Sequence, residues 1–261
     1  IDIQKKLISF GSIYLDTLKV IDINGDEEKV KNFLQGQITS DINLVSSETF
    51  HLSSICNQKG LVMADFLICK TNNVFKIIIN NELVDAFIKE LTPFAKFFGV
   101  TFLETKKHVC ASIESSPFSK RVFLKNKDFA LSVKIDNKVK DISDAISSEG
   151  WSIANMLLGN FYLSKDDVGK YRPLEINYDK LRVSFDKGCF KGQEIVARMK
   201  YLGVDRRKFC TIISKKEIKE GKDFKTLGKS IKLQNNFIFL GIFKKDYLEI
   251  FKKENPSITI I

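Results

Sequence analysis

The sequence predicts an α+β protein built from short antiparallel strands and a few helices. Between residues 50 and 103, strand-like apolar runs alternate with turn signals, and one helical stripe interrupts them. After Gly203, short apolar runs separated by turns rich in Lys, Gly and Asn are typical of a small antiparallel barrel or sandwich. The chain has 261 residues, of which 44% are hydrophobic and 28% charged. This is the composition of a soluble globular protein with one large domain or two to three small ones.

The first hundred residues carry the clearest local patterns. Apolar alternation in residues 1–23 ends at the turn signal Asn24-Gly25, and Asp26 has the residue type of a helix N-cap. The helix that follows is predicted to reach about Gln35. A second helical stripe follows Leu83 and is predicted to break near Pro93. Strands are predicted at residues 50–56, 61–69, 74–79 and 100–103.

The remaining elements are predicted mainly as strands. A helix-like stretch is expected to begin at Asp141, to be interrupted at Gly150 and to carry an apolar pattern up to Gly159. Trp151 is expected to anchor the core rather than to stack on a ligand. Further strands are predicted at residues 108–114, 121–124, 128–133, 209–213, 230–233, 237–243, 247–251 and 258–261.

Residues 186–203 combine a cysteine, two bracketing glycines and a short helix. The glycines allow a tight turn around Cys189, and the helical pattern starts at Gln193. Lysines lie on both sides of this cysteine, which also precedes a helix N-terminus, and both features favour the thiolate over the thiol. We therefore weigh a functional cysteine above a buried structural one.

The same stretch carries a family resemblance. The run Lys-Gly-Cys-Phe-x-Gly-Gln-Glu-x-x-Ala-Arg, residues 187–198, resembles the signature of the YgfZ family. These folate-binding proteins are related to the T-protein, the aminomethyltransferase of the glycine cleavage system, and they support iron–sulfur proteins. Residues 33–41, Phe-Leu-Gln-Gly-Gln-Ile-Thr-Ser-Asp, resemble the family's N-terminal motif, with Ser40 where asparagine is usual. With residues 57–66, the resemblance covers most of the chain up to about Arg207.

The resemblance implies the domain organisation. Members of the family fold as a ring of three small domains around a central hole, where a folate binds with its pterin buried. By this pattern, residues 1–45 and 106–203 form a discontinuous α+β domain of the folate-binding type. Residues 46–105 form an inserted, strand-rich α+β domain, and residues 204–261 form a small C-terminal β-barrel after a charged linker at 204–208. The implied cofactor is tetrahydrofolate or a polyglutamylated folate.

The resemblance also implies two cofactor-binding carboxylates. A leucine–glutamate pair holds the pterin in the T-protein relatives, and Glu175 lies in the matching pair here. A carboxylate can accept two parallel hydrogen bonds from the pterin amino group and ring N–H. A salt bridge of Glu175 with Arg172 or Arg182 is the structural alternative. Asp65 is the second carboxylate.

Asp65 belongs to a segment that carries two adjacent acids in T-proteins. Ala64 replaces the first of them here. This departure counts against aminomethyl transfer, because that chemistry needs a carboxylate against the reacting nitrogen. An exposed aspartate, or one that faces the hairpin, is the alternative for Asp65.

The implied roles in the cysteine segment follow the same resemblance. Cys189 is assigned to thiol chemistry, with Lys187 as its electrostatic partner. Gln193 and Glu194 are expected to fix the turn and to belong to the cofactor-binding residues. Arg198 is expected to pair with Glu194 one helical turn earlier.

Composition indicates where the protein works. Five cysteines are scattered without a CxxC pair, and there are two histidines. We therefore expect no disulfide framework and no dedicated zinc or cluster site, and a reducing cytoplasm fits best. No apolar run is long enough to span a membrane, and the first residues do not resemble a signal peptide.

Three functions of different classes remain open. The first is a folate-binding accessory protein, without classical turnover, for assembly or repair of iron–sulfur proteins, including tRNA-modifying radical enzymes. Its partners would be folate and the iron–sulfur client or assembly proteins. The second is a folate-dependent aminomethyltransferase. The third is a basic RNA-binding protein, with tRNA as a weak contact.

Net charge alone does not favour RNA binding. The net charge is +10, but the lysines are spread along the chain among 32 acidic residues, and no basic motif is interleaved with aromatics. The signature around Cys189 favours the accessory protein.

Overall fold

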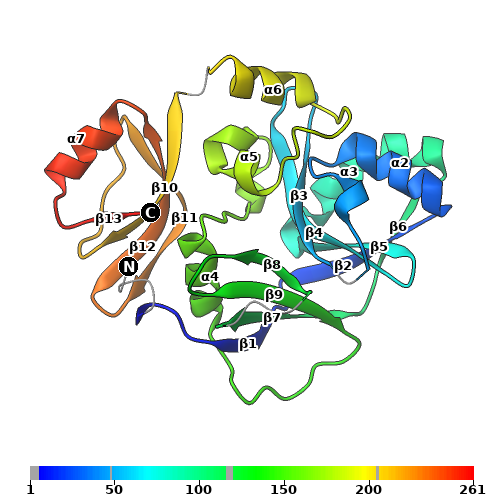
Figure 1. Ribbon diagram of the computed structural model, residues 1–261, viewed down its shortest axis with the longest axis horizontal. Coiled ribbons are helices and arrows are strands. Elements are labelled where there is room, and N and C mark those ends of the chain that lie inside the picture. The colour runs from blue at the N-terminus through cyan, green and yellow to red at the C-terminus, as the bar shows by residue number, and fades with distance from the viewer. Residues whose placement is uncertain (1–5, 48, 116–119, 204–205) are drawn as a thin grey trace.

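The computed structural model describes residues 6–47, 49–115, 120–203 and 206–261. Three antiparallel sheets lie around a common centre, with helices α4 (Ser148–Leu157) and α5 (Tyr178–Leu181) between them (Figure 1). The predicted mixture of helices and antiparallel strands is confirmed.

The five-stranded sheet is buried on both faces. Its strands, in spatial order, are β3 (His51–Cys56), β4 (Val62–Thr71), β5 (Val74–Asn80), β2 (Leu18–Asn24) and β6 (Thr101–Glu104). Ile77 and Ile79 face a core with helices α2 (Glu27–Gln37) and α3 (Val84–Phe98), whereas Ile78 faces a second core with the four-stranded sheet. This explains the three successive isoleucines of β5, residues 77–79, which are typical of a strand covered on both sides.

The two helices of this sheet begin and end as their sequences allow. Asp26 caps α2, since its carboxylate accepts the backbone N–H of Lys29. The predicted break of α3 at Pro93 is wrong, because the helix continues through this proline to Phe98. Burial of the stripe that contains Leu91 and Ala95 outweighs the one lost hydrogen bond, and Gly99 ends the helix in the left-handed conformation.

The four-stranded sheet packs against the second face of the five-stranded sheet. Its spatial order is β1 (Gly11–Tyr14), β7 (His108–Glu114), β9 (Ala130–Asp136) and β8 (Val122–Lys125). The helix predicted from Asp141 is absent from this stretch; residue 145 instead forms an isolated parallel bridge with Ser12. The helix begins at Ser148, where the Ser147 hydroxyl accepts the N–H of Gly150, so Gly150 lies within α4 and does not interrupt it.

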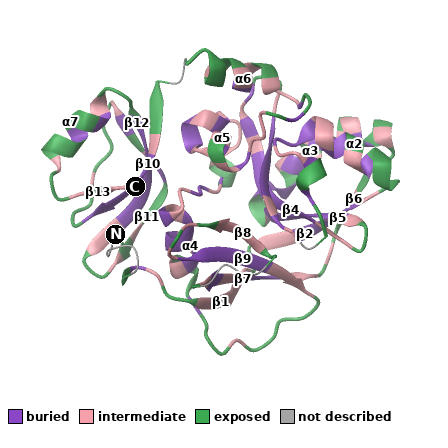
Figure 2. Cartoon of the chain, in the orientation of Figure 1, coloured by how far each residue is buried: buried purple, intermediate pink, exposed green. Residues whose placement is uncertain are grey.

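The C-terminal sheet is open. It consists of β11 (Phe224–Leu233), β12 (Asn236–Lys244), β10 (Arg207–Ser214) and β13 (Thr259–Ile260). Among the described strands no pairing joins β11 to β13, so the predicted closed barrel is not confirmed. Figure 2 shows buried residues concentrated in the strands of the three sheets, with exposed residues on the outer helices.

The strand predicted at residues 247–251 is instead helix α7 (Tyr247–Glu254). Leu248 and Phe251, three residues apart, both face the sheet and are buried. The Phe251 ring lies 5.4 Å from that of Phe224 and 4.8 Å from that of Phe243. The apolar spacing therefore has the helical period, which a five-residue window does not separate from a strand.

A long connection with little regular structure links α4 to the C-terminal sheet. It contains α5 and then α6 (Gln193–Tyr201), which begins where the sequence predicted. Residues 204 and 205 of the predicted charged linker lie outside the described residues. Short 3₁₀ helices complete the fold: η1 (Ile42–Leu44), η2 (Asn81–Leu83), η3 (Lys165–Asp167) and η4 (Pro173–Ile176).

The division into domains stays a prediction. Strand β2 pairs with β5 and β6, so a boundary at residue 45 would divide the five-stranded sheet between two domains. Among the described helices, none has the length and apolar character needed to cross a membrane.

Candidate functional site

Two adjoining cavities lie where the three sheets meet. The first has a volume of about 210 Å³ and is lined from β2, β4, β5, β9 and α4. The second, of about 480 Å³, is lined from α4, residues 160–162, β11 and β12. Both have Trp151, Ser152 and Tyr162 in their walls. We call the pair the central cavities; all three sheets contribute to them.

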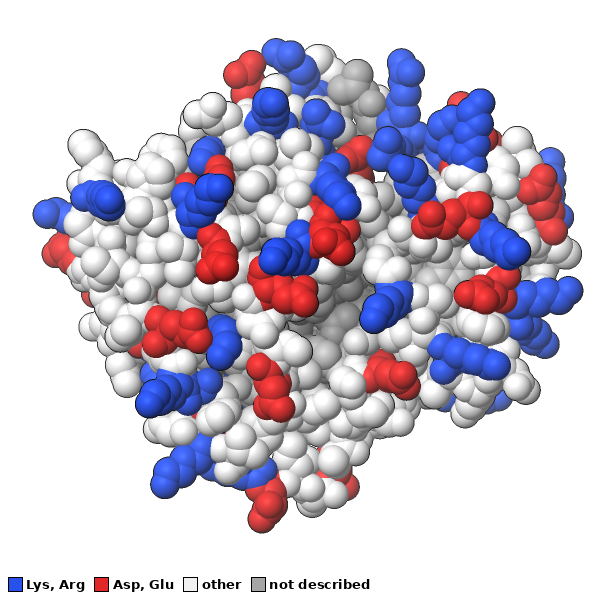
Figure 3. Space-filling model, turned by 180° about the vertical axis from the view of Figure 1, so that it is seen from behind, with Lys and Arg blue, Asp and Glu red and all other residues white. Residues whose placement is uncertain are grey.

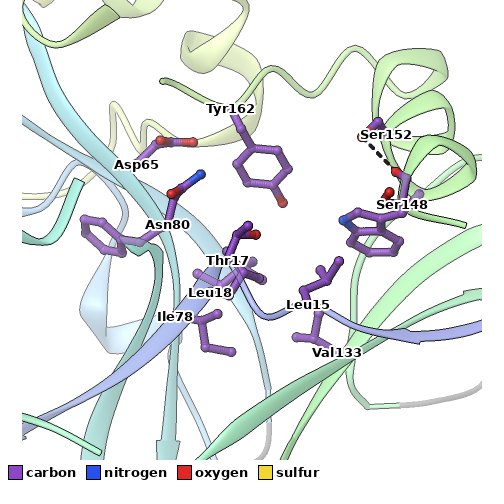
Figure 4. A pocket seen from close by; sticks show the side chains of 13 residues that line it. Leu15, Thr17, Leu18, Asp65, Ile78, Asn80, Val133, Ser148, Ser152 and Tyr162 are labelled. Atoms are coloured by element: carbon purple, nitrogen blue, oxygen red, sulfur yellow. Dashed lines mark hydrogen bonds between the residues drawn. The ribbon is translucent and has the colours of Figure 1, made fainter. Parts of the chain in front are cut away.

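Tyr162 lies at the middle of the first cavity. Figure 4 shows its ring between Asp65 and Asn80 on one side and Ser148 and Ser152 on the other. Burial raises the pKa of Tyr162, against the opposing effect of the Arg182 guanidinium. The phenol is therefore neutral near pH 7 and keeps a hydroxyl that can donate and accept hydrogen bonds.

Asp65 is the carboxylate in the wall of the first cavity. It is 2% exposed, and its Oδ1 accepts the backbone N–H of Leu163 at 3.3 Å. Its Oδ2 lies 3.3 Å from an Arg182 nitrogen but receives no well-aligned hydrogen bond from the described residues. Burial raises the pKa of Asp65, and Arg182 opposes that shift. The carboxylate therefore keeps acceptor capacity in a nearly dry wall.

Strand alternation decides which acid faces the cavity. Ala64 belongs to the core beneath α2 and α3 and does not line the first cavity, while Asp65 and Leu67, the next residues of the opposite face, do. An acid at position 64 would point into an apolar core in this fold. Asp65, the single acid of this segment, is thus on the cavity side of β4.

Arg182 is a fully buried cation that joins the elements behind this wall. Its guanidinium donates to the carbonyls of Ser53 at 3.2 Å and Phe66 at 3.1 Å, and to the Asn160 side chain at 2.9 Å. It also stacks on the rings of Tyr178 and Tyr162, at 4.6 and 5.1 Å from their centres. One side chain therefore links β3, β4 and the chain segment that enters the cavities.

The N-terminal motif contacts this network. The Thr39 hydroxyl donates to the Arg182 carbonyl at 2.7 Å and shares a hydrogen bond of 2.9 Å with the Ser54 hydroxyl. The backbone N–H of Ser184 in turn donates to the Thr39 carbonyl. The motif around Thr39 thus holds the chain on both sides of residue 183.

Lys187 ties the cysteine segment to the end of α2. Its ammonium donates to the carbonyls of Gln35, Ile38 and Ser40 at 2.7, 2.7 and 3.0 Å. An ammonium has three N–H bonds, and all three are engaged here. Lys187 therefore has no donor left for the Cys189 sulfur. Burial lowers the pKa of Lys187 to about 8.

Gly192 holds the other end of the same loop against the β3–β4 turn. Its φ is +83°, and a Cβ at this position would lie 2.3 Å from the Asn57 carbonyl oxygen. Only glycine fits such an approach. The neighbouring Lys191 donates its backbone N–H to Gly36 and its ammonium to Glu90 of α3. Three separate sequence motifs, at residues 35–41, 57–60 and 186–193, are thus brought together.

Cys189 lies exposed in this fixed loop. The Gln193 side chain accepts the backbone N–H of Phe190 at 3.2 Å, so it stabilises the turn just before α6. Glu194 is exposed and forms the predicted ion pair with Arg198 at 3.2 Å. The structure brings Cys189, Lys187 and Gln193 into one loop, and it places Asp65 in the wall of the central cavities.

Glu175 lies outside the walls of the central cavities. It is buried in η4, where one carboxylate oxygen accepts the backbone N–H of Arg172 at 2.9 Å. The other oxygen lies 3.2 Å from the Arg207 guanidinium. Its ion-pair partner is thus Arg207, at the start of the C-terminal sheet, rather than either arginine considered from the sequence.

No sequence motif pointed to several residues in the cavity wall or behind it. Tyr162 and Asn160 lie in no motif, and Arg182 was considered only as a partner of Glu175. Trp151 is 7% exposed and packs in the core as predicted, yet it also lines both cavities. Among the described residues, no group of three or more His, Cys, Asp or Glu side chains is arranged to hold a metal ion.

Comparison with known proteins gives relatives in sequence and in fold. No family model matches the chain. A protein of Colwellia psychrerythraea named tRNA-modifying protein YgfZ is 26% identical over 76% of this chain and 70% of its own length. One of the same name from Shigella sonnei is 22% identical over 94% of this chain and 90% of its own length. The chain resembles the YgfZ proteins over most of its length.

The YgfZ resemblance predicted from the sequence motifs is therefore confirmed. A YgfZ protein of Buchnera aphidicola is 28% identical over 72% of this chain. Among solved structures, glycine cleavage system aminomethyltransferase T from Bartonella henselae matches with a TM-score of 0.63. That match covers 94% of this chain and 81% of the other at 11% identity, so it is a likeness of fold.

Proposed function

We propose that this protein binds a reduced folate in the central cavities and acts as an accessory protein for iron–sulfur proteins, including enzymes that modify tRNA. The observation that carries the proposal is a buried carboxylate, Asp65, in the wall of the first of two adjoining cavities, to which all three sheets together contribute. The names of the YgfZ relatives and the aminomethyltransferase fold support it. When bound, a reduced folate can carry a one-carbon unit.

The residues of the central cavities fit a folate in size and chemistry. Volumes of about 210 and 480 Å³ compare with roughly 300–1,000 Å³ for pockets that hold drug-sized ligands. Trp151 and Tyr162 offer aromatic surface at the junction, and Asp65 offers an acceptor for the amino and ring N–H groups of a pterin. Lys229 and Lys232 line the second cavity, where they can bind the carboxylates of a glutamate tail.

Asp65 replaces Glu175 as the preferred pterin partner. Asp65 lines the first cavity, whereas Glu175 lies outside both cavities. Each carboxylate has one oxygen on a backbone N–H and the other beside an arginine, so their position relative to the cavities decides between them. Under this proposal Glu175 orders η4, and Asp65 receives the pterin.

Cys189 is proposed as the reactive group of the accessory function. Its loop is held on one side by Lys187 and on the other by Gly192, while the cysteine itself is exposed. A fixed backbone with an accessible thiol suits chemistry on another protein, because the partner can reach sulfur without local unfolding.

The other two functions have less support. The fold and the cavity-facing Asp65 are compatible with aminomethyl transfer, but the chain lacks the second acid, and position 64 faces the core. For RNA binding, Figure 3 shows basic side chains interspersed with acidic ones on the face it displays, rather than a continuous basic track.

Calorimetric titration with tetrahydrofolate, in mono- and polyglutamylated forms, tests the folate site. The parent protein should bind, and Asp65→Asn should weaken binding by about tenfold or more, since a charge-assisted pair of hydrogen bonds is lost. Glu175→Gln should bind within a few-fold of the parent. Asp141→Asn, which changes an exposed aspartate in the same way, is the matched control and should bind as the parent does.

Asp65 also pairs with the buried Arg182, so Asp65→Asn changes this ion pair as well as the cavity wall. A second variant that leaves the ion pair in place is therefore needed. Ser152→Phe enlarges a side chain shared by the walls of both cavities without removing the ion pair, and it should block binding. Circular dichroism checks that both variants are folded. No binding by the parent, or equal binding by parent, Asp65→Asn and Ser152→Phe, would refute the folate proposal.

A further inference from the structure

A smaller cavity, outside the central cavities, collects four basic side chains. It has a volume of about 170 Å³ and lies at the junction of the five-stranded and four-stranded sheets. Its cations are Lys76 on β5, Lys107 between β6 and β7, Arg121 just before β8 and Lys134 on β9. Four elements far apart in the sequence therefore deliver positive charge to one place, which we call the basic cavity.

The five-stranded sheet contributes a buried ammonium with a second one beside it. Lys76 is 5% exposed and pairs with Asp22 of β2 at 2.6 Å. The Lys107 side chain interacts with that of Lys76, and its pKa is lowered by burial and by this neighbouring ammonium. Two like charges in a partly buried setting repel each other unless an anion lies between them. Among the described residues, Asp22 is the acid that pairs with Lys76.

The four-stranded sheet contributes the opposite wall. Lys134 lies 3.3 Å from Asp136, the one acid among the described residues that line the basic cavity. That carboxylate is shared, because it also accepts the Tyr14 hydroxyl at 2.8 Å and lies 3.5 Å from Lys140. Among the described residues, Asp22 pairs with Lys76 and Asp136 with Lys134, so the three lysines of the cavity outnumber the two acids that pair with them.

We propose that the basic cavity binds a phosphate group. Ammonium and guanidinium donors on several sides are the usual partners of phosphate oxygens. Thr71 and Asn137 also line the cavity and supply neutral polar groups. The volume is below the roughly 300–1,000 Å³ of pockets for whole drug-sized ligands, so the cavity suits one anionic group rather than a complete cofactor.

This site is separate from the proposed folate site. None of its four basic residues lines the central cavities. The phosphate can be carried by a small metabolite or by an RNA strand that lies across the opening. The chemistry of recognition is shared, and the ligands used in the test distinguish the two sources.

Calorimetric titration at constant ionic strength, with inorganic phosphate, pyrophosphate and a short single-stranded RNA, tests the site. The full chain should bind phosphate or pyrophosphate saturably, and Lys107→Ala should weaken this binding by about tenfold, the loss of one charge-assisted contact. Lys107→Arg, which keeps the charge, should restore most of the affinity. Lys138→Ala, which removes an exposed lysine outside the cavity, is the matched control.

The outcomes separate cleanly. Binding of the small anions but not of RNA assigns the site to a small phosphorylated molecule. Binding of RNA that Lys107→Ala also weakens assigns it to a nucleic-acid phosphate. No saturable binding of any of the three ligands, or an equal loss in Lys107→Ala and Lys138→Ala, would overturn the proposal. Lys134→Gln gives a second reading from the opposite wall should Lys107→Ala fail to fold.

Discussion

Cys189 differs from the other four cysteines in its surroundings. Cys56, Cys69, Cys110 and Cys210 are buried, and burial raises the pKa of each thiol, to about 12 for Cys56 and Cys69. Cys189 is exposed. A buried thiol with a raised pKa is an inert apolar side chain, so accessible sulfur chemistry in this protein falls to Cys189.

We predict that Cys189→Ser abolishes the accessory function while the fold stays intact. The substitution removes the nucleophile from an exposed position, so the free energy of unfolding should change by no more than about 0.5 kcal/mol. Complementation of a strain that lacks this protein measures the function. Equal expression and unchanged tetrahydrofolate affinity are the controls. A serine variant that complements fully would remove the thiol from the mechanism.

Sequence reasoning at the residue scale found the acid and the thiol but not the residues that hold them. Asp65 and Cys189 lie in motifs that a family resemblance carries. Arg182 has no local signature, because its partners Ser53 and Phe66 are 129 and 116 residues away in the sequence. Its role exists only in the folded chain, where a guanidinium replaces solvent for buried carbonyls.

At the scale of elements, the loop that carries Cys189 packs against two other segments, the C-terminal end of α2 and the turn between β3 and β4. Lys187 satisfies three carbonyls around the C-terminal end of α2, where a helix leaves carbonyls without partners. The cation also lies at the favourable end of the helix dipole. Burial of the charge opposes these gains and lowers the pKa of Lys187 to about 8.

The stability that Lys187 contributes should therefore rise at alkaline pH. From about pH 8 to its ordinary pKa of 10.5, the unfolded chain holds a proton that the folded chain has released. The unfolding free energy of the parent, minus that of Lys187→Met, should rise over this window by up to roughly 3 kcal/mol. Urea unfolding of both proteins across pH 7–10.5 measures this difference. A difference independent of pH would show that the lysine titrates normally.

Elements with a long or sharply bounded pattern were predicted well. β7 was expected at residues 108–114 and occupies them, and α6 begins at Gln193 as expected. The errors have physical causes. Tertiary packing allows α3 to continue through Pro93. The apolar run of α7 is so short that it fits the helical period and the strand period equally well. Backbone pairing with β1, which no local pattern reveals, gives residues 144–146 a strand-like partner in place of a helix.

At the scale of the whole molecule, the central cavities depend on all three sheets at once. Their walls combine β4 with α4 and β11, which belong to different layers of the fold. The resemblance to the aminomethyltransferase family implied such an arrangement, but composition and periodicity could not place Tyr162 or Trp151 in the walls. Mutual packing of sheets creates those positions.

A ligand in the central cavities should therefore stabilise the whole molecule. At about one hundred times its dissociation constant, tetrahydrofolate should raise the unfolding midpoint by roughly 5–10 °C. Scanning calorimetry of parent and Asp65→Asn measures this, and the shift at the same ligand concentration should fall to about half or less in the variant, because its binding is at least about tenfold weaker. Far-ultraviolet and tryptophan signals should move together, because Trp151 lines both cavities. A midpoint unchanged by saturating folate would contradict the assignment.

The large sequence separation between Arg182 and its partners also decides the order in which contacts form during synthesis. A ribosome delivers β3 and β4 well before it delivers the guanidinium that joins them, and β1 before its partner β7. In the interval, the emerging N-terminal half contains the carbonyls of Ser53 and Phe66 and the carboxylate of Asp65 without their cation. The buried core is complete only when the second half of the chain has left the ribosome. The nascent protein therefore exposes apolar surface, and depends on chaperones, for longer than a chain with local contacts does.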